Sequence, residues 1–182
     1  MVVIDASHKI IVTGLGKTGK TSLLERYVEK SFTPKYTLTV VAAFYMKIVE
    51  ASGKKIFLKF WDIPGLEAIG PTRQALYWYA SGFALCFDLT DLATLIALRE
   101  VVLEEVLPVV EQGKAKNLSS VLIGCKSDLP QTINNNEIKR FQEELSSKFG
   151  FEVPYFATSA KTGENIDLIF SKLTELLLKN EK

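Results

Sequence analysis

Hydrophobic residues along the chain form short continuous runs that alternate with segments of helical periodicity. The runs lack the period-two alternation of a half-exposed strand, and continuous runs of this length are typical of parallel strands buried on both faces. A further pair of segments, joined by a Ser-Gly turn, favours a β-hairpin. The expected buried strands are residues 9–13, 83–87, 121–125 and, more weakly, 153–156, and the expected hairpin strands are residues 40–50 and 55–62.

Two segments carry an apolar stripe at helical spacing. One runs from Leu92 to Leu107, directly before Pro108, and the other from Ile166 to Leu177. Strands that alternate with helices are joined by right-handed crossovers. The pattern therefore predicts an α/β fold with a doubly wound sheet and one antiparallel strand at its edge.

Composition narrows the classes of function. The chain has 182 residues with 22 Lys+Arg and 21 Asp+Glu, a formal net charge of +1. At about 150 residues per domain, this length predicts a single domain over residues 1–182. The charge balance argues against a general nucleic-acid binder, which would carry a strong basic excess. No apolar run reaches membrane-spanning length, so we expect a cytoplasmic protein, and we expect Cys86 and Cys125 to be reduced core residues.

The segment Gly14-Leu15-Gly16-Lys17-Thr18-Gly19-Lys20-Thr21 fits the pattern G-x-x-x-x-G-K-[ST] and lies between an expected strand and an expected helix. In such a loop the backbone amides surround a phosphate, the lysine bridges the β- and γ-phosphates, and the last hydroxyl coordinates Mg²⁺. The alternative, a glycine-rich turn capped by threonine, does not account for the coincidence of strand, motif and helix. The expected nucleotide contacts are Gly14, Gly16, Lys17, Thr18, Gly19, Lys20, Thr21 and Ser22, with the Lys17 side chain facing solvent.

Three later motifs follow in order: Trp61-Asp62-Ile63-Pro64-Gly65 fits D-x-x-G, Cys125-Lys126-Ser127-Asp128 resembles N-K-x-D, and Thr158-Ser159-Ala160-Lys161 contains S-A-K. With the phosphate loop, they make the chain resemble a Ras-superfamily small GTPase over nearly its whole length. Residues 32–34, 61–62, 87–91 and 159–166 look most like the Rab branch. The resemblance implies a P-loop NTPase G domain: a six-stranded, mostly parallel sheet with one antiparallel edge strand and helices on both faces.

The resemblance also assigns roles in recognising the base of GTP or GDP. Asp128 would accept hydrogen bonds from the guanine N1–H and exocyclic amine, which adenine does not offer in that arrangement. The stem of Lys126 would cover one base face and Phe32 the other, and the Ala160 amide would meet O6. Cys125, Ser159 and Lys161 belong to the same expected nucleotide-contacting set.

At the phosphate end, the resemblance implies that Thr21, Thr39 and Asp62 hold Mg²⁺, the last through water. Thr39 is chosen because residues 39–44 lie where Rab proteins have T-I-G-V-D-F, and Thr37 is the second candidate. Gly65 would contact the γ-phosphate through its amide. The expected catalytic positions are Lys20, Gly65 and Leu66. Taken singly, each of these residues also suits an ordinary role in a core, turn or strand; the ordered set favours the nucleotide site.

Three departures from the family pattern bear on the expected nucleotide site. Leu66 occupies the position of the glutamine that orients the attacking water, and leucine forms no hydrogen bond, so we expect slow intrinsic hydrolysis. Pro64 also replaces the usual alanine just before Gly65 and fixes its own φ near −65°. Cys125 stands where the family usually has the asparagine that bonds guanine N7 and ties the base loop to the phosphate loop. A thiol is a weaker partner, so we expect lower nucleotide affinity with guanine preference retained through Asp128.

Expected partners are effector proteins and exchange and activating factors, which would contact residues 33–44 and 63–80, where Val41 and Ala43 depart from the Rab pattern. We expect a monomer that binds no nucleic acid. The chain as printed ends without a cysteine for prenylation, so membrane contact would be indirect or would use residues absent here, with a peripheral place on endomembranes as the expectation. The main hypothesis is a GTP/GDP switch; the rivals are a hydrolysis-deficient interaction module and, less supported, a small P-loop kinase.

Overall fold

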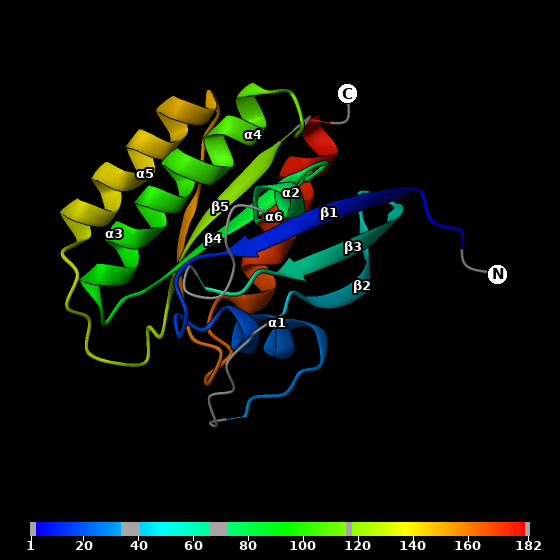
Figure 1. Cartoon of the computed structure of the whole chain (residues 1–182). Helices are drawn as coiled ribbons and strands as arrows, with labels where there is room; N and C mark the ends of the chain where they lie inside the picture. Colours follow the sequence, from blue (N-terminus) through cyan, green and yellow to red (C-terminus); the bar gives the residue numbers. More distant parts are fainter. Residues whose placement is uncertain (1–2, 34–40, 66–72, 116–117, 181–182) are drawn as a thin grey trace.

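A six-stranded sheet forms the centre of the computed structural model, which describes residues 3–33, 41–65, 73–115 and 118–180 (Figure 1). The strand order is β2-β3-β1-β4-β5-β6. β2 pairs antiparallel with β3, and every other pairing is parallel. The predicted α/β sheet with one antiparallel edge strand is confirmed. The strands are β1 (Ala6–Thr13), β2 (Ala43–Ala51), β3 (Lys54–Asp62), β4 (Gly82–Asp88), β5 (Ser119–Cys125) and β6 (Tyr155–Thr158).

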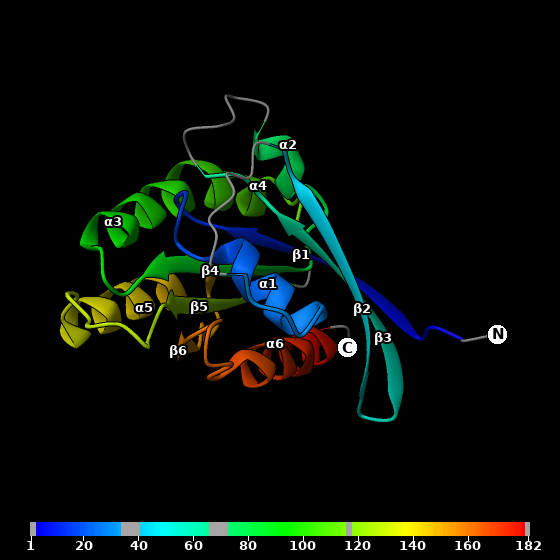
Figure 2. The same ribbon diagram turned by 90° about the horizontal axis from the view of Figure 1, so that it is seen from below.

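Helices cover both faces of the sheet. Figure 2 places α3 (Leu92–Val101) and α4 (Leu107–Glu111) on one side of it and α1 (Lys20–Val28) and α6 (Ile166–Asn180) on the other. α5 (Asn135–Phe149) and the short α2 (Arg73–Tyr77) contribute to the same core as α3. Among the described residues, no helix combines the length and the apolar character that a membrane span requires.

The continuous apolar runs of the sequence are explained by two separate cores. Ile11 of β1 belongs to the core under α3 and α5, whereas its neighbours Ile10 and Val12 belong to the core under α1 and α6. Because successive strand residues point to opposite faces, a strand buried on both sides needs apolar residues at every position. The β2–β3 hairpin turns through Ser52 (φ 52°) and Gly53 (φ 74°), as the Ser-Gly pair predicts.

Two predicted boundaries are wrong. The last strand, expected over residues 153–156, is β6 at Tyr155–Thr158, two residues further along the chain. The apolar stripe from Leu92 was expected to end before Pro108, but the helix continues to Glu111 through a π-helical turn, η1 (Val102–Val106). The Leu107 amide donates to the Val102 carbonyl, five residues back, which widens the turn. Pro108 has no N–H to donate to the carbonyl of Glu104, and that carbonyl instead accepts a hydrogen bond from Gln74 Nε2 (2.9 Å). The tertiary contact therefore allows the helix to pass the proline.

Candidate nucleotide-binding site

The phosphate-loop motif connects the end of β1 to the start of α1. Gly14 has φ +145°, and a Cβ there would lie 2.1 Å from the carbonyl oxygen of Cys86. Gly19, at φ +105°, is the residue directly before α1. Both positions need glycine, the first because strand β4 passes so close and the second because its backbone is left-handed. The glycines thus let the loop lie against the sheet and lead directly into a helix N-terminus.

Lys20 is buried under this loop, with 6% of its surface exposed. Its ammonium donates to the carbonyls of Gly14 (3.0 Å) and Leu15 (2.8 Å), and burial lowers its pKa, an effect opposed in part by Asp62. Thr18 is also buried, and its hydroxyl donates to the Leu15 carbonyl (3.0 Å). Lys17 is exposed, as expected, and Ser22 is half-buried in the first turn of α1. The loop therefore carries a buried cation whose present acceptors are neutral carbonyls.

Thr21 and Asp62 meet across 41 sequence positions, and the threonine hydroxyl donates to Asp62 Oδ2. Asp62 is fully buried, and its Oδ1 has no hydrogen-bond partner among the described residues. Burial raises the pKa of this carboxyl, while the Thr21 hydrogen bond and the Lys20 charge lower it. A hydroxyl and a carboxylate with an unsatisfied oxygen are hard oxygen ligands, so these residues fit Mg²⁺. Thr39, the third expected ligand, lies outside the described residues, as does Thr37.

Gly65 lies directly against the phosphate loop. A Cβ at this position would be 2.3 Å from the Gly16 amide nitrogen, so only glycine allows this approach. The segment before it is held to the sheet, because the Ile63 amide donates to the Val12 carbonyl (3.0 Å). Pro64 is buried. Leu66 lies outside the described residues.

The base-recognition motifs come together at the ends of β5 and β6. Asp128 Oδ1 accepts a hydrogen bond from the Ser159 hydroxyl (2.7 Å), and its Oδ2 lies 3.8 Å from Lys161 Nζ. The Ser127 amide donates to the Thr158 carbonyl (3.0 Å). Ala160, between Ser159 and Lys161, is half-buried. Two motifs that are 31 residues apart in sequence therefore form one connected group of side chains.

Two residues of this end were not among the sequence candidates. Asp88, at the end of β4, pairs with Lys126 Nζ at 2.5 Å and also accepts hydrogen bonds from the amide and hydroxyl of Thr90. Glu164 accepts from the Ser127 hydroxyl through Oε2 and from the Thr158 hydroxyl through its carbonyl. Both lie within the segments that resemble the Rab branch. The sequence comparison could therefore have pointed to them, although the resemblance assigned neither residue a role.

Cys125 still contacts the phosphate loop although it is a thiol. A Cβ placed on Gly19 would lie 3.6 Å from Cys125 Cβ and 3.9 Å from its sulfur. Cys125 and Cys86 are both buried and free, as expected. A hydrogen bond between the two side chains, together with burial, raises the pKa of Cys86 well above its ordinary value. The base loop and the phosphate loop therefore lie close together at Cys125 and Gly19.

Phe32, the residue expected to cover one face of the base, follows α1 and is half-buried.

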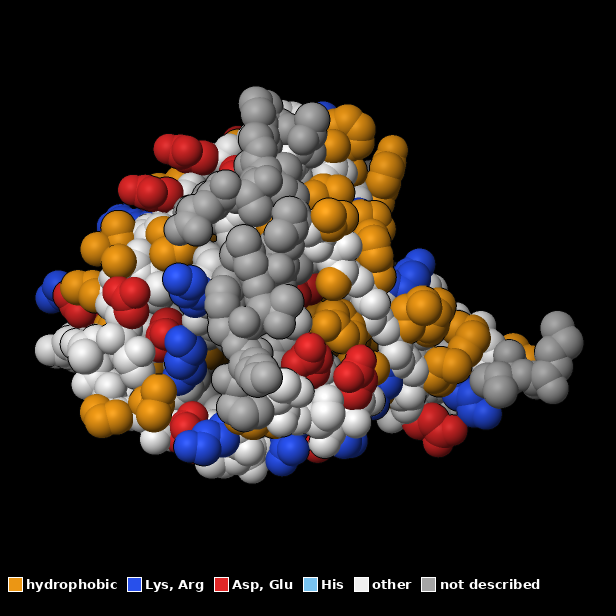
Figure 3. Space-filling model, turned by 60° about the horizontal axis from the view of Figure 1, so that its bottom comes forward, with side chains coloured by type: hydrophobic (Ala, Val, Ile, Leu, Met, Phe, Trp, Pro, Cys, Tyr) orange, Lys and Arg blue, Asp and Glu red, His pale blue; other side chains and the backbone are white. Residues whose placement is uncertain are grey.

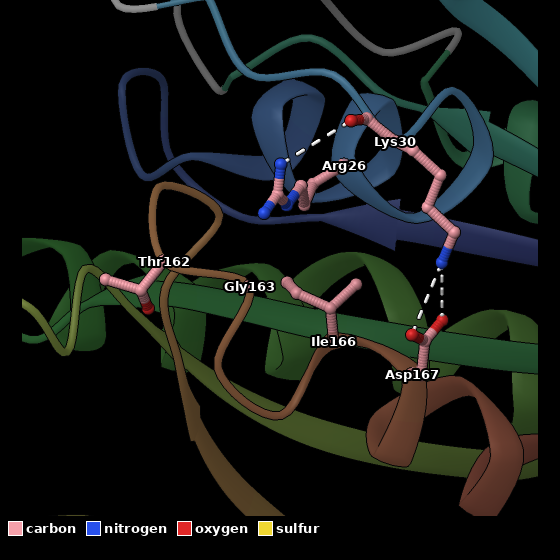
Figure 4. A pocket seen from close by; sticks show the side chains of 6 residues that line it. All are labelled: Arg26, Lys30, Thr162, Gly163, Ile166 and Asp167. Carbon is pink, nitrogen blue, oxygen red and sulfur yellow. Dashed lines mark hydrogen bonds and ion pairs between the residues drawn. The ribbon is translucent and has the colours of Figure 1, made fainter.

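Behind the S-A-K loop, a hollow of ≈ 330 Å³ opens between the end of α1 and the start of α6 (Figure 4). The exposed pair of Lys30 and Asp167, 3.0 Å apart, lies at one side of it. The described residues that bound this hollow are Arg26, Lys30, Thr162, Gly163, Ile166 and Asp167, and none of these six is an expected nucleotide contact.

Comparison with known proteins agrees with this arrangement. A sequence model described as "Ras family" matches residues 9–179. Human Ras-related protein Rab-27B is 35% identical over 185 residues, covering 96% of this chain and 81% of the relative. Ras-related protein SEC4 of Candida albicans is 31% identical, covering 95% and 78%. The GTP-binding protein yptV5 of Volvox carteri is 32% identical, covering 96% and 83%. The chain therefore belongs to the Ras family of small GTPases, in its Rab branch.

Proposed function

We propose that this chain is a guanine-nucleotide switch that binds GTP and GDP with Mg²⁺ and hydrolyses GTP slowly. The observation that carries the proposal is the group formed by the buried Lys20 and Asp62 and the half-buried Thr21 at the glycine loop, with one oxygen of Asp62 left without a partner among the described residues. A buried polar atom without a partner is costly. A metal ion would satisfy the free oxygen of this carboxylate. A phosphate group beside the metal would neutralise the positive charge of Lys20.

The phosphates would bind where the loop amides and the α1 N-terminus point. The Lys20 ammonium would exchange the neutral carbonyls of Gly14 and Leu15 for charged phosphate oxygens, a stronger interaction. Thr21 and Asp62 would hold Mg²⁺, which would neutralise phosphate charge. The Gly65 amide, beside Gly16, would sense the γ-phosphate.

At the base end, Asp128 would select guanine, with Ser159 holding the carboxylate in place through the 2.7 Å hydrogen bond. Asp88 would fix the end of Lys126 so that the lysine stem lies against the base. Phe32, Ala160 and Lys161 would complete the base site. Cys125 would contribute packing rather than a strong hydrogen bond, which lowers affinity.

The surface next to the phosphate end suits protein partners. Hydrophobic side chains gather at the β2–β3 side of the molecule (Figure 3), where Phe44 and Met46 are each 59% exposed and Ile48 is 49% exposed. Phe44 packs edge-to-face on Trp61, with ring centroids 4.6 Å apart. Together with residues 33–44 and 63–80, this patch would bind effectors, exchange factors and activating factors. The Rab relatives favour a role in vesicle trafficking, for a monomer at the cytoplasmic face of endomembranes.

The second candidate function is an interaction module that stays loaded with nucleotide and does not hydrolyse it. Leu66 favours it, because a leucine side chain forms no hydrogen bond and so does not orient the attacking water. Single-turnover GTP hydrolysis separates the two functions: slow but measurable conversion supports the switch, and no conversion supports the module. In Leu66→Gln, we expect hydrolysis to be about tenfold faster or more. Fast wild-type turnover, unchanged by the substitution, would contradict the role assigned to this position.

The experiment that tests the proposal as a whole is to identify the copurifying nucleotide by chromatography and to titrate nucleotide-free protein with fluorescent GDP, GTP and ADP, with and without Mg²⁺. Tight, Mg²⁺-dependent binding of GDP and GTP and weak binding of ADP are expected. The matched variants are Asp62→Asn, which should lose the Mg²⁺ dependence, and Asp167→Asn, an exposed carboxylate that should behave as wild type. Equal affinity for ADP and GDP would overturn the assignment of guanine.

A further inference from the structure

One face of the sheet stays open where β2, β3 and β1 lie side by side. α1 and α6 pack against the other face of this part of the sheet. Because successive strand residues point to opposite faces, the side chains at alternate positions share the open face. We call this surface the outer face. Its exposed or half-buried side chains are Lys9, Phe44, Met46, Ile48, Lys59 and Trp61.

Two lysines stand side by side in the middle of the outer face. Lys9 of β1 and Lys59 of β3 are register partners on parallel strands. Neighbouring strands are about 4.8 Å apart, and like charges directly opposite each other destabilise a sheet. Burial, and after it the charge of Lys59, lower the pKa of Lys9 to about 8. The positive charge of this pair is therefore unfavourable in the domain by itself.

The Lys9 ammonium is held at a fixed place on this face. Its Nζ lies 3.7 Å from the centre of the Trp61 ring and donates a hydrogen bond to the Trp78 carbonyl at 2.8 Å. A cation over an indole ring is attracted to it, but neither group carries a negative charge. An ammonium has three donor hydrogens, and the carbonyl uses one of them. The ammonium is thus both positioned and able to donate to a further acceptor.

No carboxylate of the described residues forms an ion pair with Lys9 or Lys59. The acidic residues that follow along this face are Glu50 and Asp5, and both lie beside Lys55. Glu50 is the register partner of Lys55, whose amide donates to Asp5 Oδ2 at 2.7 Å. The lysine pair is therefore uncompensated within the described part of the chain.

Other cations of the domain that lie out of full contact with water do have a carboxylate beside them. Arg73 is 1% exposed, and its Nε lies 2.9 Å from Glu105 Oε2. Lys126 pairs with Asp88 at 2.5 Å. A charge removed from water needs a partner of opposite sign. The missing partner of the lysine pair is what sets the outer face apart.

Exposed apolar side chains surround the lysine pair. Met46 is the register partner of Lys59, and Phe44 and Ile48 lie on either side of Met46 along β2. Trp78, whose carbonyl binds Lys9, is exposed on the other side. Contiguous exposed apolar surface marks an interaction site, and aromatic residues and methionine are enriched in interfaces. The face thus offers apolar area with two positive charges at its centre.

We propose that Lys9 and Lys59 are the carboxylate-binding part of the outer face, and that this face takes a segment of a partner protein in which an acidic residue stands among apolar ones. The inference rests on the proposed function, since it names the chemistry of a partner at the β2–β3 surface. A carboxylate between the two ammonium groups would form charge-assisted hydrogen bonds and relieve their repulsion. Apolar side chains beside it would cover Met46 and Ile48 and exclude water, which strengthens the charge interaction.

Two other occupants fit these observations less well. A symmetric contact with a second copy, centred on this face, would bring the lysine pair against its own equivalent, and like charges across an interface repel. An anionic membrane attracts lysines that reach the headgroups from the rim of an apolar patch. Lys9 and Lys59 instead lie at the centre of the patch, where a carboxylate that arrives with an apolar segment can meet them.

Selection of peptides from a random library displayed on phage, with the full chain as the target, tests the proposal. Peptides that also bind Ile48→Ser are discarded, so that the retained ones require the outer face. We expect the retained peptides to carry Asp or Glu close to Leu, Phe or Trp. The Kd of one retained peptide is then measured. Lys59→Met should weaken its binding by about tenfold, as should replacing the acidic residue of the peptide by its amide.

The matched control is Lys54→Met, which removes a lysine of the same strand whose position belongs to the opposite face and should leave the Kd unchanged. Lys59→Met combined with the amide peptide should bind little more weakly than either change alone, because both remove the same contact. A general disturbance of the surface by Lys59→Met would instead give additive losses. Lys59→Gln serves if Lys59→Met does not fold.

Several outcomes would overturn the proposal. These are retained peptides without an excess of Asp or Glu, no retained peptide, additive losses in the cycle, and an equal Kd for Lys59→Met and the wild type. The rival occupants are measured in parallel, with vesicles of phosphatidylcholine and phosphatidylserine for a membrane and analytical ultracentrifugation for a second copy. If Lys59→Met abolishes either of these interactions and no acidic peptide is retained, that occupant replaces the partner segment and the proposal is wrong.

Failure of the proposed function has a different signature. The titration with fluorescent GDP, GTP and ADP reports nucleotide binding directly, and Lys59→Met should leave the Kd for GDP unchanged, because the lysine pair lies outside the candidate nucleotide site. If the nucleotides do not bind, the peptide selection is carried out on the nucleotide-free chain, and the carboxylate-binding role of the lysine pair is judged by the same results.

Discussion

The phosphate end and the base end of the candidate site are held together in different ways. At the phosphate end, Lys20 and Asp62 are buried, and the lysine donates hydrogen bonds to carbonyls of its own loop. At the base end, side chains bond to side chains from other loops, and the Lys126 side chain is 36% exposed. The first end is built mainly from one continuous motif, and the second is assembled from three separate segments.

This difference sets how each end responds to substitution. Charge interactions in a buried site are stronger than the same interactions near water. We therefore expect the loss of the buried cation from the phosphate loop to cost more binding free energy than the loss of any single contact at the base end. At the base end, several contacts contribute separately, so single substitutions there should have graded effects on affinity, and those that remove a contact to guanine should also change selectivity.

The largest effect is expected for Lys20→Met. The substitution removes the two charge-assisted hydrogen bonds that the ammonium would donate to phosphate oxygens, and it leaves Asp62 without its nearby cation. At about 1.5–3 kcal/mol for each such bond, two lost bonds correspond to a loss of GDP affinity of about 100-fold or more. Titration with fluorescent GDP measures it, with Lys139→Met on the exposed face of α5 as the control. A loss of less than tenfold would remove the contrast between the two ends.

The next effect concerns guanine selection. Asp128→Ala removes both expected hydrogen bonds to the base and leaves the Ser159 hydroxyl without its acceptor. We expect GDP affinity to fall by about 100-fold, while ADP affinity changes by less than about threefold, because adenine does not use these bonds. Competition titrations with GDP and ADP give the ratio. If both nucleotides weaken equally, Asp128 supports the fold of the loop rather than reading the base.

A smaller effect is expected at Asp88, the carboxylate that pairs with Lys126. Asp88→Asn should weaken GDP binding by about fivefold, since a partly exposed pair contributes roughly 1 kcal/mol. We expect Asp88 to affect GDP binding only by positioning the Lys126 side chain. The double variant Asp88→Asn/Lys126→Met should therefore bind GDP no more weakly than Lys126→Met alone. Additive losses in this double-mutant cycle would show that Asp88 acts independently of Lys126.

The smallest expected change is a gain in GDP affinity. Cys125→Asn supplies an amide in place of a thiol at the contact with Gly19, and one neutral hydrogen bond contributes about 0.5–1.5 kcal/mol. GDP should bind up to about tenfold more tightly, with a slower dissociation rate. Cys125→Ala, which adds no hydrogen bond, should show no gain. An unchanged Cys125→Asn would mean that packing against Gly19 already holds the base loop fully.

Much of the fold followed from the pattern of apolar residues. The buried strands, the hairpin with its Ser-Gly turn and the C-terminal helix are all present, because each depends on local periodicity and turn chemistry. The helix that passes Pro108 could not be predicted. Local rules end a helix at proline, and the acceptor that the proline leaves unpaired is satisfied by Gln74, which is 30 residues away.

The candidate site was likewise predicted in part, and the rest depends on contacts between residues distant in sequence. The expected pairs of Thr21 with Asp62 and of Asp128 with the S-A-K loop lie together in the structure. The contributions of Asp88 and Glu164 were missed, because an acidic residue after a strand has many ordinary uses and its partner is a distant lysine or serine. The buried charge of Arg73 gave no signal either, since arginine in a polar segment is normally exposed.

The sequence by itself determined the phosphate loop, the order of strands and helices and the family, because these depend on residues that are neighbours in the chain. Only the tertiary structure decided which charges meet: Asp88 with Lys126, and Arg73 with Glu105. The physical reason is that a charge is stabilised by whatever lies within a few ångströms of it in space, and the chain brings these partners together only when the sheet and its helices have closed around them.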